Sequence, residues 1–217
     1  MKHLNKIIIA IVLIMGLNAQ AQDSKNPWAV SFGVNAIDTK TSAGGGHGFL
    51  DRHFSQPFAV KDNWNFVAPL SYVGVSKYLG DNFSVSIEGS LNKISKLVTF
   101  NPTAQGHDSR GYVVSNPGDL MYYGIDASVK YSFISLIKSK QIDPSISLGF
   151  GYSSLGENSY GTVNPGVGVI FWYTDTVGLE LATKYKKSYG DRGTAVALDS
   201  PSLFQHSLGL IFKFGGK

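Results

Sequence analysis

Apolar and polar residues alternate along most of the chain after residue 27, which is the pattern of half-buried β-strands. In residues 28–38, for example, Trp28, Val30 and Phe32 fall on one face, and the residues between them are small or polar. Helical periodicity is hard to find. Eight strands are therefore predicted, over residues 28–38, 67–78, 83–92, 120–134, 145–155, 162–174, 177–189 and 204–214.

The links between these strands are predicted to alternate in length. Short links fall at residues 79–82, 135–143 and 175–176, and long ones at 39–66, 97–119, 156–161 and 190–203. Such alternation is typical of an up-and-down membrane barrel, whose short turns face the periplasm. The sequence thus predicts an all-β fold, an eight-stranded antiparallel up-and-down transmembrane β-barrel.

The two faces of the strands distinguish a soluble, ligand-carrying barrel from a membrane barrel. A soluble barrel turns its apolar face inward, whereas a membrane barrel turns it toward lipid and keeps a polar interior. The polar faces here carry mainly Gly, Ser, Ala and Asn, with too few charges for a wall that faces water. We therefore expect the bulky apolar side chains to face lipid and the small polar ones to fill a narrow interior.

Residues 1–21 have the three parts of a secretory signal peptide. Lys2 and Lys6 precede an apolar run over residues 7–17, and Ala19-Gln20-Ala21 forms a small-residue cleavage site. The uncharged stretch is shorter than a membrane-spanning helix requires. The predicted organisation is a signal peptide over 1–21, cleaved to leave a mature chain from about Gln22, and an outer-membrane barrel over 22–217.

Composition excludes several classes of protein. The chain of 217 residues has 25 glycines, no cysteine and a formal net charge of +4. Without cysteine, a disulfide framework and a Cys-ligated metal site are ruled out. Nucleic acid is not an expected partner, because Arg52, Arg110 and Arg192 lie far apart and no basic cluster surrounds them.

Six segments of the sequence resemble the N-terminal barrel of Bacteroidota OmpA-family outer membrane proteins. They cover residues 26–38, 66–94, 119–133, 161–174, 177–189 and 204–216, beginning with NPWAVSFGVNAID and ending with FQHSLGLIFKFGG. The resemblance implies a barrel in the cell outer membrane of a Gram-negative bacterium. The family commonly continues into an acidic calcium-binding linker and a peptidoglycan-binding domain. Because this sequence stops at Lys217, the resemblance implies a barrel-only member, and cell-wall tethering is not carried over.

Five charged residues fall on the small-residue face, and we expect them in the barrel lumen. Unpaired ions are costly in a narrow interior, so these charges should pair and plug it. A small ion channel or porin lined by the same charges is the alternative. The residues are Glu88, Asp126, Lys130, Glu180 and Lys184.

Aromatic residues cluster near the predicted strand ends, as in the interfacial girdles of membrane barrels. The predicted girdle comprises Trp28, Tyr78, Phe83, Tyr131, Phe133, Trp172, Tyr173, Phe212 and Phe214.

Catalysis and metal binding have little support in the sequence. His206 and Ser207 are neighbours on one strand, so their side chains point to opposite faces, with His206 on the lipid side. Asp51 and His53 have a spacing that metal ligands use, but histidines in loops are more often solvated. We expect no catalytic residue, no metal and no cofactor.

Function is therefore expected in the barrel and its loops. The link over residues 39–66 is rich in large apolar side chains, which suits packing on the barrel mouth or docking against a larger outer-membrane complex. The predicted role is structural or assembly-accessory, with lipid and other outer-membrane proteins as partners. The apolar residues of this link are Phe49, Leu50, Phe54, Phe58, Trp64 and Phe66.

Overall fold

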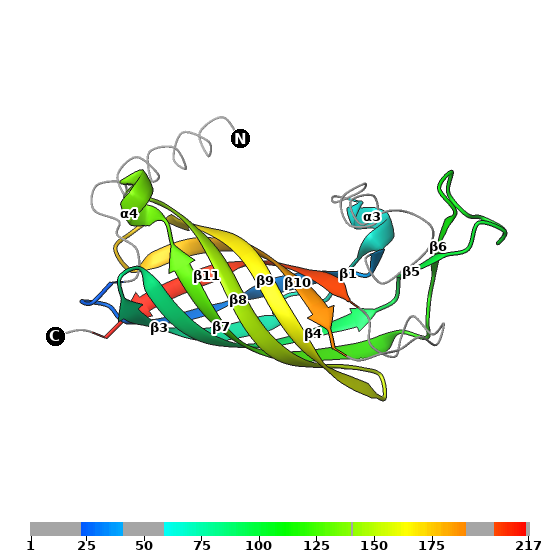
Figure 1. Ribbon diagram of the computed structural model, residues 1–217, viewed down its shortest axis with the longest axis horizontal. Coiled ribbons are helices and arrows are strands. Elements are labelled where there is room, and N and C mark those ends of the chain that lie inside the picture. Colours follow the sequence, from blue (N-terminus) through cyan, green and yellow to red (C-terminus); the bar gives the residue numbers. More distant parts are fainter. Residues whose placement is uncertain (1–22, 41–58, 140, 190–201, 216–217) are drawn as a thin grey trace.

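The computed structural model describes residues 23–40, 59–139, 141–189 and 202–215. Eight long strands form a closed antiparallel barrel in which each strand pairs with its neighbours in sequence (Figure 1). The predicted eight-stranded up-and-down barrel is confirmed. Its strands are β1 (Trp28–Asp38), β3 (Tyr72–Gly80), β4 (Phe83–Ile94), β7 (Leu120–Ser132), β8 (Ile142–Leu155), β9 (Asn158–Trp172), β10 (Val177–Ser188) and β11 (Leu203–Phe214).

The first and last strands close the barrel. β1 and β11 pair without interruption from Trp28 opposite Phe214 to Asp38 opposite Phe204. Because a closed sheet has no free edge, the backbone groups of the wall pair with one another, as a hydrocarbon environment demands.

The two ends of the barrel differ in their connections. One end, here the turn end, carries the start of β1, the end of β11 and the links over residues 81–82, 133–141 and 173–176. The 133–141 link contains the short helix α4 (Ile134–Ile137). The other, the loop end, carries α3 (Val60–Asn63), β2 (Trp64–Phe66) and a two-stranded sheet of β5 (Leu97–Phe100) with β6 (Tyr112–Ser115). Figure 1 shows these additions gathered beyond the barrel at its right.

Two features of the connections differ from the sequence prediction. The link predicted as long at residues 156–161 is a two-residue turn, because β8 and β9 pair as far as Leu155 opposite Asn158. Gly156 supplies the left-handed backbone of that turn, with φ of 59°. The strand predicted over residues 67–78 begins only at Tyr72, because residues 67–71 leave the sheet. The predicted signal peptide and most of the 190–203 link lie outside the described residues.

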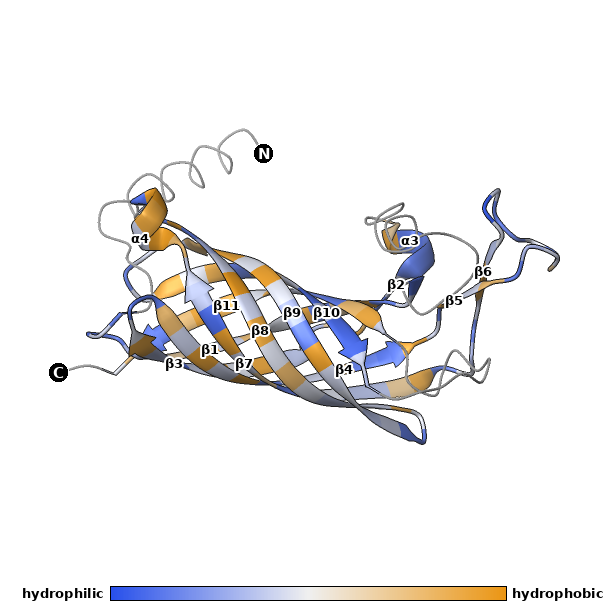
Figure 2. Cartoon of the chain, viewed as in Figure 1, coloured by the Kyte–Doolittle hydropathy of each residue, from blue (hydrophilic) through white to orange (hydrophobic). Residues whose placement is uncertain are grey.

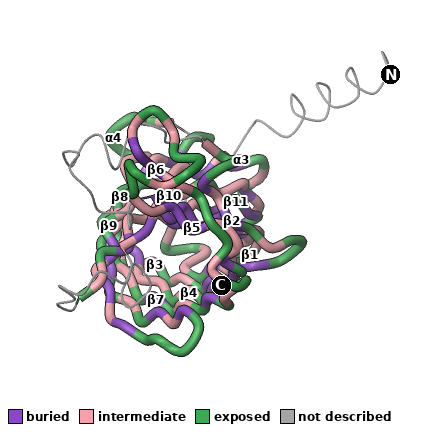
Figure 3. The backbone as a smooth tube through the Cα atoms, turned by 90° about the vertical axis from the view of Figure 1, so that its right-hand side faces the viewer, coloured by how far each residue is buried: buried purple, intermediate pink, exposed green. Residues whose placement is uncertain are grey.

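The wall has the predicted sidedness. Ile87, Ile125 and Leu148 are 62%, 57% and 56% exposed on the outside, whereas Asn92 and Asp126 are buried inside. Figure 2 shows apolar residues distributed over the barrel wall, and Figure 3 shows buried residues along the strands in the view from the loop end. Within the described part of the chain, no helix is long and apolar enough to cross a membrane.

Candidate functional site

Four charged side chains meet in the middle of the interior and form what we call the central network. Lys184 on β10 lies 2.7 Å from a carboxylate oxygen of Glu88 on β4 and 3.8 Å from one of Asp126 on β7. Lys186, two residues farther along β10, binds both carboxylate oxygens of Asp126, at 2.7 and 3.0 Å. Positive and negative charges therefore alternate, and their formal sum is zero.

The central network offsets the repulsion between two carboxylates that the strand register places side by side. Glu88 and Asp126 are direct neighbours across the β4–β7 pair, and like charges in such positions destabilise a sheet. Lys184 reaches across from β10 and contacts both carboxylates. Amides complete the arrangement, with Gln205 donating to Glu88 at 3.1 Å and Asn164 donating to Asp126 at 2.8 Å. The pairs thus join facing walls of the barrel.

A second ion pair lies nearer the turn end. The Lys130 ammonium is 3.7 Å from a carboxylate oxygen of Glu180, and each side chain is 18% exposed. The structure thus places all five predicted lumen charges inside the barrel, each within ion-pairing distance of an opposite charge.

Apolar side chains fill the interior on either side of these charges. At the turn end the cluster is small, and Ile134 of α4 packs against it from outside the barrel strands. We call these clusters the loop-end plug and the turn-end plug. The loop-end plug consists of Ile37, Ile94, Tyr122, Leu155, Tyr160 and Leu203, and the turn-end plug of Ala29, Ile170, Trp172 and Ile211.

A small polar cavity remains between the central network and the turn-end plug. Its volume is about 50 Å³, and its lining runs from Glu88 and Lys184 to Ile211 and includes seven serines. This is room for about one or two water molecules. The cavity can hydrate the ion pairs, and an apolar plug lies toward each end of the barrel from it.

Most of the predicted aromatic girdle lies on the outside at the turn end. Tyr131 lies between Phe83 and Phe133, with ring centroids 4.9 and 5.2 Å away, and Phe212 stacks on Phe32. The exposed members are Trp28, Phe83, Tyr173 and Phe214.

Two predicted girdle residues are placed differently. Trp172 is 2% exposed and belongs to the turn-end plug, with the Lys213 ammonium 4.9 Å from its ring centroid. Tyr78 shares the inward-facing side of β3 with Tyr72 and Gly74, and its hydroxyl accepts a bond from the Asn82 N–H at 3.4 Å. The girdle assignment of Trp172 is wrong because aromatic residues at strand ends also serve as interior plugs.

His206 occupies the predicted outer face near the loop end. Its ring stacks on Trp64 at 4.4 Å between centroids, and its Nδ1 is 2.9 Å from the Thr183 hydroxyl. Ser207 is buried on the opposite face. Asp51 and His53 lie outside the described residues, as do Phe49, Leu50, Phe54 and Phe58. Within the described ranges, no cluster of three or more His, Cys, Asp or Glu side chains is suited to a metal ion.

An exposed ion pair marks the rim of the loop end. Lys93 and Asp119 lie 2.7 Å apart, and their side chains are 47% and 43% exposed. Hydrogen bonds from Lys93, and secondarily from the Asn116 amide, hold the pKa of the Asp119 carboxyl below its usual value.

The closed eight-stranded sheet, the apolar outer wall and the polar, plugged interior define the class of small up-and-down barrels. No family model and no curated protein matches the sequence. Among solved structures, the N-terminal β-barrel domain of Pseudomonas aeruginosa OprF is similar, with a TM-score of 0.50 and 10% identity over 88% of this chain and 100% of that one.

Two further outer-membrane proteins are similar at lower scores. OprG of Pseudomonas aeruginosa has a TM-score of 0.46 and 10% identity, over 93% of this chain and 99% of that one. Escherichia coli outer membrane protein W has a TM-score of 0.45 and 14% identity, over 88% and 99%. At these identities, the OprF likeness shows the fold.

Proposed function

We propose that this chain is an integral outer-membrane barrel with a structural or assembly-accessory role, not an enzyme and not a pore. The observation that carries the proposal is the filled interior, in which two apolar plugs flank a neutral set of ion pairs. An eight-stranded barrel has an interior only wide enough for side chains. The fold shared with the OprF barrel domain and the apolar outer wall support the membrane location.

The sequence adds finer parts to this proposal. The six segments that resemble Bacteroidota OmpA-family proteins favour membership of that family, and residues 1–21 favour export through a cleaved signal peptide. Surrounding lipid is then the first partner. The exposed Phe66 and the β5–β6 sheet at the loop end are available for contact with other proteins of an outer-membrane complex.

Planar-bilayer recording tests the closed interior. We expect the wild-type barrel to insert without steady ion conductance, because ions would have to pass both plugs. Removing one large aromatic side chain from each plug, in Tyr122→Ala with Trp172→Ala, is expected to produce conductance steps. The folded state of the double variant is checked first by its heat-modifiable migration on a gel.

The small-channel alternative has one observation in its favour, the polar cavity beside Lys130 and Glu180. Steady conductance by the wild-type barrel, reduced when Lys130→Met alters the charge beside the cavity, would establish the channel and overturn the closed-lumen proposal.

A further inference from the structure

An apolar groove lies on the outer wall, centred on a glycine that nothing in its surroundings requires. Gly89 on β4 faces outward between Val73 and Ile125, and a Cβ at this position would meet no atom within 4 Å. Its φ is not in the left-handed region. Glycine inside a strand is unfavourable relative to alanine. Gly89 leaves open the floor of a hollow of about 560 Å³ in the wall, which we call the Gly89 groove.

One side of the Gly89 groove is a ridge, formed where the chain passes from β2 to β3. β2 pairs with the loop end of β1 and β3 with its turn end. Between them residues 67–71 leave the sheet, so that Leu70, 48% exposed, stands beside the groove.

Hydrogen bonds hold this ridge in place where ladder bonds are missing. The Ser71 N–H donates to the Gly33 carbonyl at 2.8 Å, and the Ser71 carbonyl accepts from the Leu91 N–H at 2.9 Å. The Asn35 side chain donates to the Ser71 and Leu91 carbonyls, and Asn92 donates to Asn35. Because these side chains are buried, the ridge is a fixed part of the wall.

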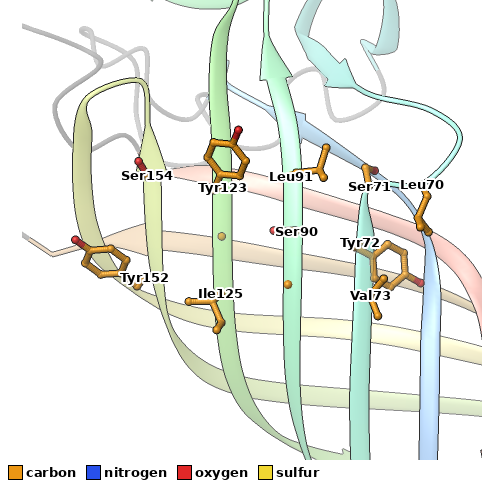
Figure 4. A pocket seen from close by; sticks show the side chains of 12 residues that line it. Leu70, Ser71, Tyr72, Val73, Ser90, Leu91, Tyr123, Ile125, Tyr152 and Ser154 are labelled. Atoms are coloured by element: carbon orange, nitrogen blue, oxygen red, sulfur yellow. The ribbon is translucent and has the colours of Figure 1, made fainter.

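Three outward-facing side chains with hydroxyls line the Gly89 groove, and two of them lie toward the loop end, whereas Tyr152 lies beside Ile125. Figure 4 shows Val73 and Ile125 at the lower part of the groove, with Tyr123 and Ser154 nearer the loops. Ser71 is buried, and its hydroxyl accepts a hydrogen bond from the Asn35 N–H at 2.6 Å. Beyond Tyr123 and Ser154, Lys93 lies two residues past Leu91 on the same outward face of β4. From mid-wall to rim, the outward-facing side chains thus change from mainly apolar ones, through ones that carry hydroxyls, to the charged Lys93.

We propose that the Gly89 groove seats one phospholipid of the surrounding bilayer, with an acyl chain over Gly89 and the headgroup toward Lys93. This inference rests on the proposed membrane location. The groove is continuous with the lipid-facing wall, and its sequence of apolar, hydroxyl and charged groups follows that of acyl chain, ester and phosphate. A glycine floor and a fixed ridge distinguish this seat from the rest of the wall.

Native mass spectrometry tests whether a lipid molecule stays bound in the groove. The full barrel is reconstituted into dioleoylphosphatidylcholine vesicles and then extracted in mild detergent. Wild-type protein is expected to retain one lipid molecule. Gly89→Leu places its Cβ in open space and its side chain over the floor of the groove. It is expected to lower the retained fraction about tenfold, because keeping two methylene groups of the lipid out of the groove costs about that ratio.

Gly161→Leu is the matched control. Gly161 also faces outward on a strand, and a Cβ there meets its nearest neighbour at 3.8 Å, an ordinary contact. This variant adds the same atoms away from the groove and should retain lipid as the wild type does.

Three outcomes would overturn the seat, namely no lipid on the wild-type barrel, equal retention by Gly89→Leu, or a second protein or second copy in place of lipid. Quenching of Trp28 fluorescence separates these failures from failure of the membrane location. It is measured in vesicles of brominated lipid, on a variant that retains Trp28 and has phenylalanine at the other two tryptophans. If Trp28 is quenched while retention is unchanged, the seat alone is wrong.

Discussion

Asp126→Asn is expected to destabilise the folded barrel by roughly 3–5 kcal/mol, the usual cost of removing one member of a buried ion pair. The Lys186 side chain is 1% exposed and lies 2.7 Å from the Asp126 carboxylate. With the carboxylate gone, that ammonium is left buried without its counter-ion, whereas Lys184 keeps Glu88. Urea unfolding in detergent micelles, followed by tryptophan fluorescence, measures the change.

Asp119→Asn is the control for this prediction. It makes the same change in an ion pair whose side chains are more than 40% exposed, so it should change the stability far less than Asp126→Asn does. Adding Lys186→Met to Asp126→Asn removes the stranded charge and should recover much of the stability. Equal stability of Asp126→Asn and the wild type would show that the central network does not hold the barrel together.

Gly33→Val is expected to prevent most of the protein from folding. A Cβ at Gly33 would overlap the backbone carbonyl oxygen of Leu208 and lie 2.5 Å from the Gly209 Cα. These are backbone atoms of β11, which pairs with β1 along the full length of β1. Relief would require parting the two strands that close the barrel. Gel migration without boiling measures the folded fraction, because the intact barrel migrates differently from the unfolded chain.

Gly89→Ala is the matched control for Gly33→Val. It places a Cβ in open space on another strand and should fold as well as the wild type or better, since alanine is the more favourable strand residue. Equal folded fractions for Gly33→Val and Gly89→Ala would show that close backbone approach at Gly33 is not required for closure.

Period-two alternation was sufficient to predict the barrel and its sidedness, because inside and outside differ sharply in polarity. It was insufficient at residues 158–161, where the strand continues into what was predicted as a loop. There Tyr160 faces inward and packs in the loop-end plug, so an apolar interior residue interrupts the expected polar face. The ridge at residues 67–71 likewise depends on side-chain bonds between distant strands, which alternation does not encode.

The lumen charges could be chosen from the sequence because they share the small-residue face. The predicted set does not include Lys186, although Lys186 lies on the same face of its strand as Lys184. Its importance arises from the separation of β7 and β10 across the interior, which alternation does not measure. The position of Trp172 could not be predicted either, because aromatic side chains at a strand end suit both a lipid interface and an apolar plug.

The orientation of the wall is tested most directly by quenching of two tryptophans with lipids brominated on their acyl chains. Trp28 and Trp172 lie at the same end of the barrel, but Trp28 is 40% exposed on the outside and Trp172 is 2% exposed inside. Variants that retain one of the three tryptophans, with phenylalanine at the other two, are reconstituted into vesicles. Strong quenching of Trp28 and little quenching of Trp172 is the predicted result. Unquenched Trp28, or Trp172 quenched as strongly as Trp28, would contradict an outer wall that faces lipid.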